Sequence, residues 1–154
     1  MARLISALSL VLLIVTSSLG EQSFVGTYRL VSITVEVDGK PFLQRGKAWH
    51  GYLVLTPTHF VVFYTADNRK FGASVEGKVA LFDTLVATSG VYRVEGNKMI
   101  TTYNASWVEN VIGTTGEDTW QLSGNRLTLT YGPTPFPNDP SKMMINRRVW
   151  EKVE

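Results

Sequence analysis

Hydrophobic and polar residues alternate with a period of two along most of this chain. The repeating unit is clearest in Gly51–Ala66, where two runs rich in Val, Phe and Tyr, Tyr52–Leu55 and Phe60–Tyr64, flank the sequence Thr-Pro-Thr-His. β-Branched and aromatic residues fit the pleated, half-buried surface of a sheet, and a short polar break that contains proline is typical of a turn. We therefore predict a β-hairpin here.

Further strands are predicted on both sides of this hairpin. In the first of them the apolar residues change parity near Leu30–Val31, which indicates a β-bulge. The sequences Glu95-Gly96-Asn97 and Ser123-Gly124-Asn125 are of the Gly/Asn type that closes tight hairpins. The strands expected outside Gly51–Ala66 are Phe24–Val37, Gly90–Val94, Met99–Trp107, Asp118–Leu122, Arg126–Tyr131 and Met144–Glu151.

Three segments depart from this period. Gly39–His50 carries Pro41 and several charged residues, which favours a loop. Ser74–Ser89 has apolar residues at helical spacing behind Ser74, a residue type that often caps a helix, so a helix is predicted there. Gly132–Ser141 contains four prolines and is expected to form a stiff extended loop.

Eight short strands, glycine-rich turns and one helix predict an all-β fold. The even spacing of the strands favours a closed, antiparallel up-and-down barrel over a two-sheet sandwich. The barrel would occupy residues 21–154 as a single domain, because the whole chain of 154 residues is about the size of one domain.

The beginning of the chain has the pattern of an export signal. Arg3 supplies a positive charge, Leu8–Val15 is a short apolar run, and small residues precede Gly20. These features predict a signal peptide over residues 1–20 and hence a secreted or periplasmic protein. The apolar run is too short to span a bilayer comfortably, so no stable membrane span is expected after cleavage.

The amino-acid composition argues against several kinds of binding site and partner. The chain has no cysteine, which excludes disulfides and thiolate metal sites. Without residues 1–20 it carries 14 Lys and Arg against 13 Asp and Glu, a balance that argues against nucleic acid as a partner. His50 and His59 are the only histidines and do not have the spacing of a zinc site, so we expect neither a metal nor a cofactor.

Short segments spread over nearly the whole mature chain form a recognisable series. They are Gly26-Thr27-Tyr28-Arg29-Leu30-Val31-Ser32, Gly51-Tyr52-Leu53 with Thr56-Pro57, Gly90-Val91-Tyr92, Ser106 with Asn110, Gly113 and Thr114, Leu122 with Gly124-Asn125-Arg126-Leu127-Thr128-Leu129, and Trp150. In order and spacing they resemble the bacterial and fungal lipocalin-like domain family. The resemblance implies a small barrel with a central cavity and an embedded helix. It also implies carriage of apolar small molecules, although a few relatives act on natural-product intermediates.

Two positions depart from the family's pattern, and one motif matches its opening. Relatives often carry histidine where Thr101-Thr102 stands here, and arginine where Asp118 stands. Gly26-x-Tyr28 resembles the Gly-x-Trp signature of true lipocalins, in which a basic residue of the last strand covers the aromatic ring. By this resemblance Arg147 or Arg148 would cover Tyr28.

Six large amphipathic aromatic residues on the predicted strands are candidates for ligand binding. An eight-stranded barrel has room for packed side chains or one small ligand, and such residues supply apolar walls with a hydroxyl or indole donor. The alternative is that most of them simply fill the core. The six are Tyr64, Tyr92, Tyr103, Trp107, Trp120 and Tyr131.

Asp118 is the one weak candidate for catalysis. It has the same parity as Trp120, and a carboxylate that faces a barrel interior is usually paired and sometimes functional. With Tyr103 or His50 it would serve a cofactor-free isomerase, cyclase or hydratase that acts inside the cavity. If Asp118 faces outward, it is an ordinary surface charge.

The sequence thus supports three functions from different classes. The leading hypothesis is an exported lipocalin-like protein that binds a small, largely apolar molecule in the barrel cavity. The cofactor-free enzyme is the second hypothesis. The third is a structural or interaction module that uses the proline-rich segment around Phe136. No oligomeric state is predicted.

Overall fold

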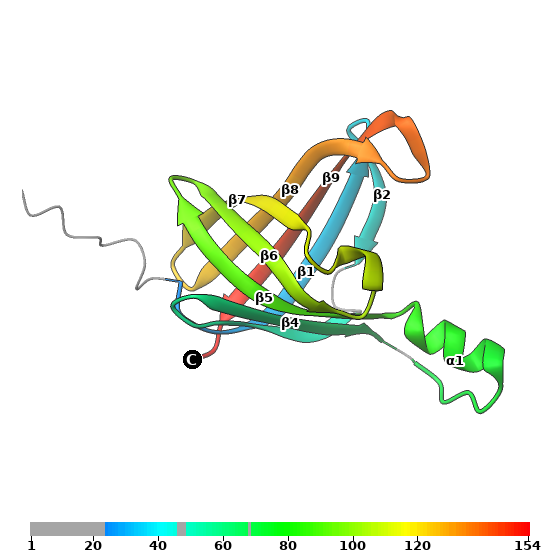
Figure 1. The fold of residues 1–154 in the computed structure, drawn as a ribbon. Coiled ribbons are helices and arrows are strands. Elements are labelled where there is room, and N and C mark those ends of the chain that lie inside the picture. The colour runs from blue at the N-terminus through cyan, green and yellow to red at the C-terminus, as the bar shows by residue number, and fades with distance from the viewer. Residues whose placement is uncertain (1–23, 46–48, 68) are drawn as a thin grey trace, which may run out of the picture.

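The computed structural model describes residues 24–45, 49–67 and 69–154, so the predicted signal peptide over residues 1–20 lies outside the described part. Figure 1 shows a barrel of strands from which one short helix projects. In chain order the elements are β1 (Gly26–Val37), β2 (Lys40–Arg45), β3 (Trp49–Leu55), β4 (His59–Ala66), α1 (Val75–Phe82), β5 (Leu85–Glu95), β6 (Lys98–Ser106), the 3-10 helix η2 (Glu109–Val111), β7 (Thr115–Ser123), β8 (Arg126–Phe136) and β9 (Asp139–Lys152).

The strands form one antiparallel sheet that closes on itself. Their order is β2-β1-β3-β4-β5-β6-β7-β8-β9, and β1 also pairs with β9. On its other edge β1 pairs with β3 through Gly26–Arg29 and with β2 through Ile33–Val37. Eight strands therefore close the barrel and β2 is an additional strand. The predicted eight-stranded up-and-down barrel with one short helix is confirmed.

Because hydrophobic and polar residues alternate along the strands, apolar side chains fill the inside of this barrel. In β3, Gly51, Leu53 and Leu55 are buried, whereas Tyr52 and Val54 between them are exposed. Inward side chains of the other strands meet them, because successive residues of a strand point to opposite faces. The resulting core consists of Phe24, Tyr28, Leu30, Ile33, Leu53, Leu55, Phe60, Met99, Leu127, Leu129 and Trp150.

The parity change in β1 is the predicted bulge. In the register of β1 and β9, Leu30 lies opposite Trp150 and Ser32 lies opposite Val149, which leaves Val31 as the extra residue. A bulge increases the local twist and bends the strand. The bend helps β1 pair with β9 on one side while it passes from β3 to β2 on the other.

The segment predicted as a loop at Gly39–His50 is a correction, because it contains the strand β2 and the start of β3. A tight turn at Asp38 and Gly39, with φ of 48° and 72°, folds β2 back onto β1. Pro41 does not prevent pairing, since β2 is an edge strand and proline is tolerated where no second neighbour needs its N–H.

The helix predicted over Ser74–Ser89 is confirmed only in its first half. Ser74 caps α1, and its hydroxyl accepts a hydrogen bond of 3.1 Å from the backbone N–H of Gly77. From Leu85 onward the chain is strand β5, which pairs with β4. The helical spacing of the apolar residues beyond Phe82 is therefore incidental, because the open edge of β4 offers backbone hydrogen bonds and a buried face.

The proline-rich segment Gly132–Ser141 is also a correction, since β8 continues to Phe136 and β9 begins at Asp139. The reason lies in the neighbours of β8. Its pairing with β7 ends at Tyr131, and beyond that residue β8 pairs only with β9. Pro133 and Pro135 therefore occupy strand positions at which a missing N–H leaves no partner unsatisfied on the β7 side, while Pro137 lies in the turn between β8 and β9.

One end of the barrel is closed by side chains from the N-terminal segment. Tyr28 is fully buried and its hydroxyl donates a hydrogen bond of 2.9 Å to the carbonyl of Phe24. The Phe24 ring meets Trp120 edge to face, with ring centroids 4.5 Å apart. The connections at this end are the short turns at residues 56–58, 96–97 and 124–125, whereas α1 and η2 lie at the opposite, more open end (Figure 1).

Tyr28 makes the stability of the barrel sensitive to high pH. Burial, assisted by the nearby Tyr92, raises the pKa of the Tyr28 phenol above its usual value of 10.0. The unfolded chain therefore loses this proton first, so the stabilisation is complete below about pH 10 and is lost as the pH rises through the pKa of the folded phenol. We expect Tyr28→Phe to cost about 1 kcal/mol at neutral pH, for the lost hydrogen bond. Urea unfolding from pH 8 upward should show this difference shrinking above about pH 10, and a constant difference would contradict the prediction.

Candidate functional site

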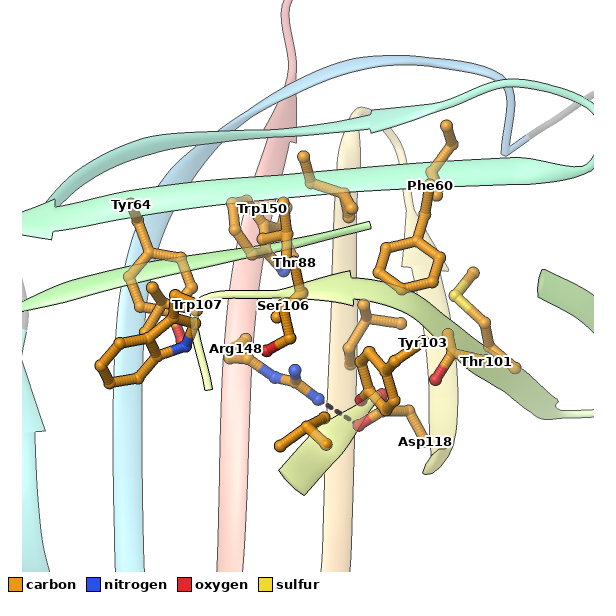
Figure 2. Close-up of a pocket in the computed structure, with 17 residues that line it drawn as sticks. Phe60, Tyr64, Thr88, Thr101, Tyr103, Ser106, Trp107, Asp118, Arg148 and Trp150 are labelled. Carbon is orange, nitrogen blue, oxygen red and sulfur yellow. Dashed lines mark hydrogen bonds and ion pairs between the residues drawn. The ribbon is translucent and has the colours of Figure 1, made fainter. Parts of the chain in front are cut away.

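A cavity of about 170 Å³ lies inside the barrel. Its wall is largely apolar, and Figure 2 shows the rings of Phe60, Tyr64, Tyr103, Trp107 and Trp150 around it. A cavity of about 150 Å³ is enough to bind benzene when its lining is apolar. The space is therefore suited to a single ring with a small substituent. The other lining residues are Leu53, Leu55, Val62, Val86, Thr88, Met99, Thr101, Ser106, Val111, Asp118, Leu129 and Arg148.

An ion pair is built into this apolar wall. The Nη2 group of Arg148 donates a hydrogen bond to Oδ1 of Asp118 (Figure 2). The side chain of Asp118 is 7% exposed and that of Arg148 is 20% exposed. Both residues line the cavity, and Arg148 has the larger exposed fraction of the two.

The register of three strands brings the pair together. Asp118 lies on β7 and Arg148 on β9, with β8 between them. Adjacent strands are about 4.8 Å apart, so the two backbones are separated by about 10 Å, a gap that the long arginine side chain can cross. Arg148 points inward because it shares parity with Trp150, and Leu129 of β8 lies directly opposite it.

Arg148 keeps its charge in spite of its surroundings. Burial alone would disfavour the charged guanidinium, but the carboxylate of Asp118 and the hydroxyl groups of Tyr64 and Tyr103 outweigh it and raise the pKa of Arg148. Arg148 is therefore a fixed cation in the cavity wall, and Asp118 is its counter-charge.

Two donors in the wall have no acceptor. Nε of Arg148 and Nε1 of Trp150 are buried and lack a hydrogen-bond partner among the residues that the structure describes. Both atoms can only donate a hydrogen bond. These two donors are buried in the wall, whereas the exposed part of the Arg148 side chain is what a molecule in the cavity can contact.

The structure brings together three of the six predicted aromatic residues, since Tyr64, Tyr103 and Trp107 line the cavity. Tyr92 and Trp120 do not line it, and they use their polar groups at the closed end. Tyr92 donates a hydrogen bond to the carbonyl of Thr56, at 2.7 Å, and Trp120 donates to that of Gly96, at 3.1 Å. Tyr131 is 37% exposed and lies outside the cavity lining. A role of any of the six in ligand binding stays a prediction.

Arg148 is the residue whose place sequence reasoning missed. The expectation that Arg147 or Arg148 covers Tyr28 is wrong, because Tyr28 lies opposite Lys152 and the two arginines lie opposite Thr34 and Ile33, about 16 Å further along β1. A signal was present in the sequence. Arg148 and Trp150 are two residues apart and so point to the same face of their strand. If Trp150 is expected to face the barrel interior, Arg148 must face it too.

Of the two proposed partners of Asp118 in catalysis, only Tyr103 lies on the same side of the barrel wall. Asp118 and Tyr103 both line the cavity, but His50 lies on the outer face of β3 and pairs with Asp67 at 2.5 Å. Within residues 24–45, 49–67 and 69–154, no cluster of three or more His, Asp or Glu side chains is placed to hold a metal ion. Catalysis by Asp118 with Tyr103 stays a prediction.

Comparison with known protein families identifies the fold. The family model of a lipocalin-like domain matches residues 25–153. The chain belongs to the lipocalin-like domain family. In this lipocalin-like domain the match covers β1 through β9. It agrees with the resemblance seen in the sequence and with small-molecule binding in general.

A search of curated proteins gave no match to this lipocalin-like domain. Among the residues with a described structure, no helix has the length and apolar character needed to cross a bilayer.

Proposed function

We propose that this lipocalin-like domain is exported after removal of residues 1–20 and binds one small, largely apolar molecule in its barrel cavity. The cavity of about 170 Å³, walled by aliphatic and aromatic side chains with a few polar groups, carries the proposal. Such a lining is typical of small-molecule sites, in which apolar contact supplies affinity and a few polar groups orient the ligand. Recovery of the protein from its host with Glu21 as its first residue would test export.

The size of the cavity limits the affinity. A single-ring molecule buries on the order of 200 Å², which at about 25 cal/mol per Å² corresponds to about 5 kcal/mol before the cost of immobilisation. Dissociation constants no tighter than about 0.2 mM are therefore expected for the simplest ligands.

A cavity-filling substitution tests the proposal. Val62 lines the cavity, while its neighbour Val61 is 50% exposed on the outer face of β4. We expect Val62→Trp to weaken binding of α-methylstyrene by at least about tenfold, because the indole occupies the same space. Val61→Trp adds the same side chain outside the barrel and should bind like the wild type. Isothermal titration calorimetry measures both, and equal binding by the two variants would contradict a ligand site inside the barrel.

A further inference from the structure

The guanidinium of Arg148 is the strongest hydrogen-bond donor in the cavity wall. One of its N–H groups is used by Asp118, and the side chain, which lines the cavity, keeps 20% of its surface exposed. Nε of Arg148 and the indole N–H of Trp150 also lack an acceptor, but both atoms are buried below the surface of the cavity. The exposed part of the guanidinium therefore offers an N–H donor to a molecule in the cavity, and without a ligand only water can accept a hydrogen bond from it.

The carboxylate of Asp118 determines whether the acceptor group of the ligand should be charged or neutral. It already balances the charge of Arg148, so the pair is neutral as a unit. A ligand carboxylate would add an uncompensated negative charge to a largely apolar cavity, which is costly. A pure hydrocarbon would avoid that cost but would displace water from the exposed part of the guanidinium without replacing its hydrogen bond. A neutral carbonyl oxygen satisfies a donor without adding charge.

From these observations we infer that the ligand is a neutral, carbonyl-bearing apolar molecule whose carbonyl oxygen accepts a hydrogen bond from Arg148. This inference rests on the proposed function, because it names the ligand class of the same cavity. The volume of about 170 Å³ restricts the body of such a ligand to about one ring with a short substituent. A ketone, ester or amide on a single ring has the required chemistry.

Three probes of nearly equal size separate the possible ligand classes. Acetophenone carries the neutral carbonyl, α-methylstyrene replaces that oxygen by a methylene group, and benzoate carries a carboxylate. We expect wild-type protein to bind acetophenone about 10-fold to 100-fold more tightly than α-methylstyrene, the range expected for a hydrogen bond to a charged donor. Benzoate should bind more weakly than acetophenone.

Substitution of the ion pair assigns this preference to its residues. The double variant Asp118→Leu/Arg148→Met removes both charges together, and in it acetophenone and α-methylstyrene should bind within about twofold of each other, since no charged donor distinguishes them. Arg147→Met is the matched control, because Arg147 lies next to Arg148 on the outer face, and this variant should keep the wild-type preference. Isothermal titration calorimetry gives each dissociation constant.

The possible results separate the two proposals. If α-methylstyrene binds and Val62→Trp blocks it, but acetophenone binds no better, the carbonyl inference fails while the proposed function stands. Tighter binding of benzoate, or a preference that persists in a folded double variant, also overturns the inference. If no probe binds at millimolar concentration, both proposals fail. The comparison of probes in wild-type protein decides the question even if the double variant does not fold.

Discussion

Replacing Arg148 by methionine alone is expected to lower the free energy of unfolding by about 3 to 5 kcal/mol. The substitution leaves the carboxylate of Asp118, whose side chain is 7% exposed, without its counter-charge inside the barrel. The cost of an unpaired buried charge is larger than the attraction that the pair gains, since both groups have already lost their hydration. The reciprocal variant, Asp118→Leu, should be destabilised for the same reason.

The double variant distinguishes this explanation from simple loss of packing. Asp118→Leu/Arg148→Met replaces both charges by apolar groups, and we expect it to be within about 1 kcal/mol of the wild type or more stable, as for other buried pairs. Arg147→Met is the control, since Arg147 is exposed and only 3.9 Å from Glu36, and it should change stability by less than about 0.5 kcal/mol. Urea unfolding measures all four. A double variant as unstable as the worse single variant would show that the pair itself stabilises the fold.

Trp150→Ala is expected to destabilise the barrel by about 3 to 5 kcal/mol. Trp150 is 1% exposed and belongs to the central core, where its ring lies 6.2 Å from that of Tyr64. Removing the indole enlarges a cavity that already measures about 170 Å³, and a β-barrel wall closed by hydrogen bonds cannot collapse to refill it.

A conservative variant at the same position separates volume from hydrogen bonding. The indole Nε1 has no partner among the described residues, so Trp150→Phe loses only part of the ring and should cost about half as much as Trp150→Ala. Thermal and urea unfolding of the two variants provide the comparison. Equal destabilisation by alanine and phenylalanine would contradict the assignment of this energy to packing.

Local sequence patterns predicted the structure correctly where it depends on residues within one strand or one turn. The alternation in β3, the bulge at Leu30–Val31 and the Gly/Asn turns at residues 96–97 and 124–125 all depend on neighbours in the chain. Local signals misled where a distant strand competes with local preference. Leu85 and Val86 have helical spacing but pair with β4, and Pro133 and Pro135 lie in the part of β8 that has lost its second neighbour.

The candidate site could be predicted only in part for the same reason. Tyr64, Tyr103 and Trp107 were found because aromatic residues on inward parity are visible in the sequence, whereas the height of a residue along the barrel is not. Tyr92 and Trp120 have inward positions too, but they lie near the closed end and contact the turns there. His50 was paired with Asp118 although the wall of β3 lies between them.

The sequence alone determined that this chain is a closed barrel with an aromatic interior, because period, turn residues and family pattern are all properties of short segments. Only the tertiary structure decided that Asp118 meets Arg148 across β8 and that both face the cavity. That contact joins residues of two strands that are not neighbours in the sheet. It depends on the register and the curvature of three strands at once, and neither can be deduced from any single segment of the sequence.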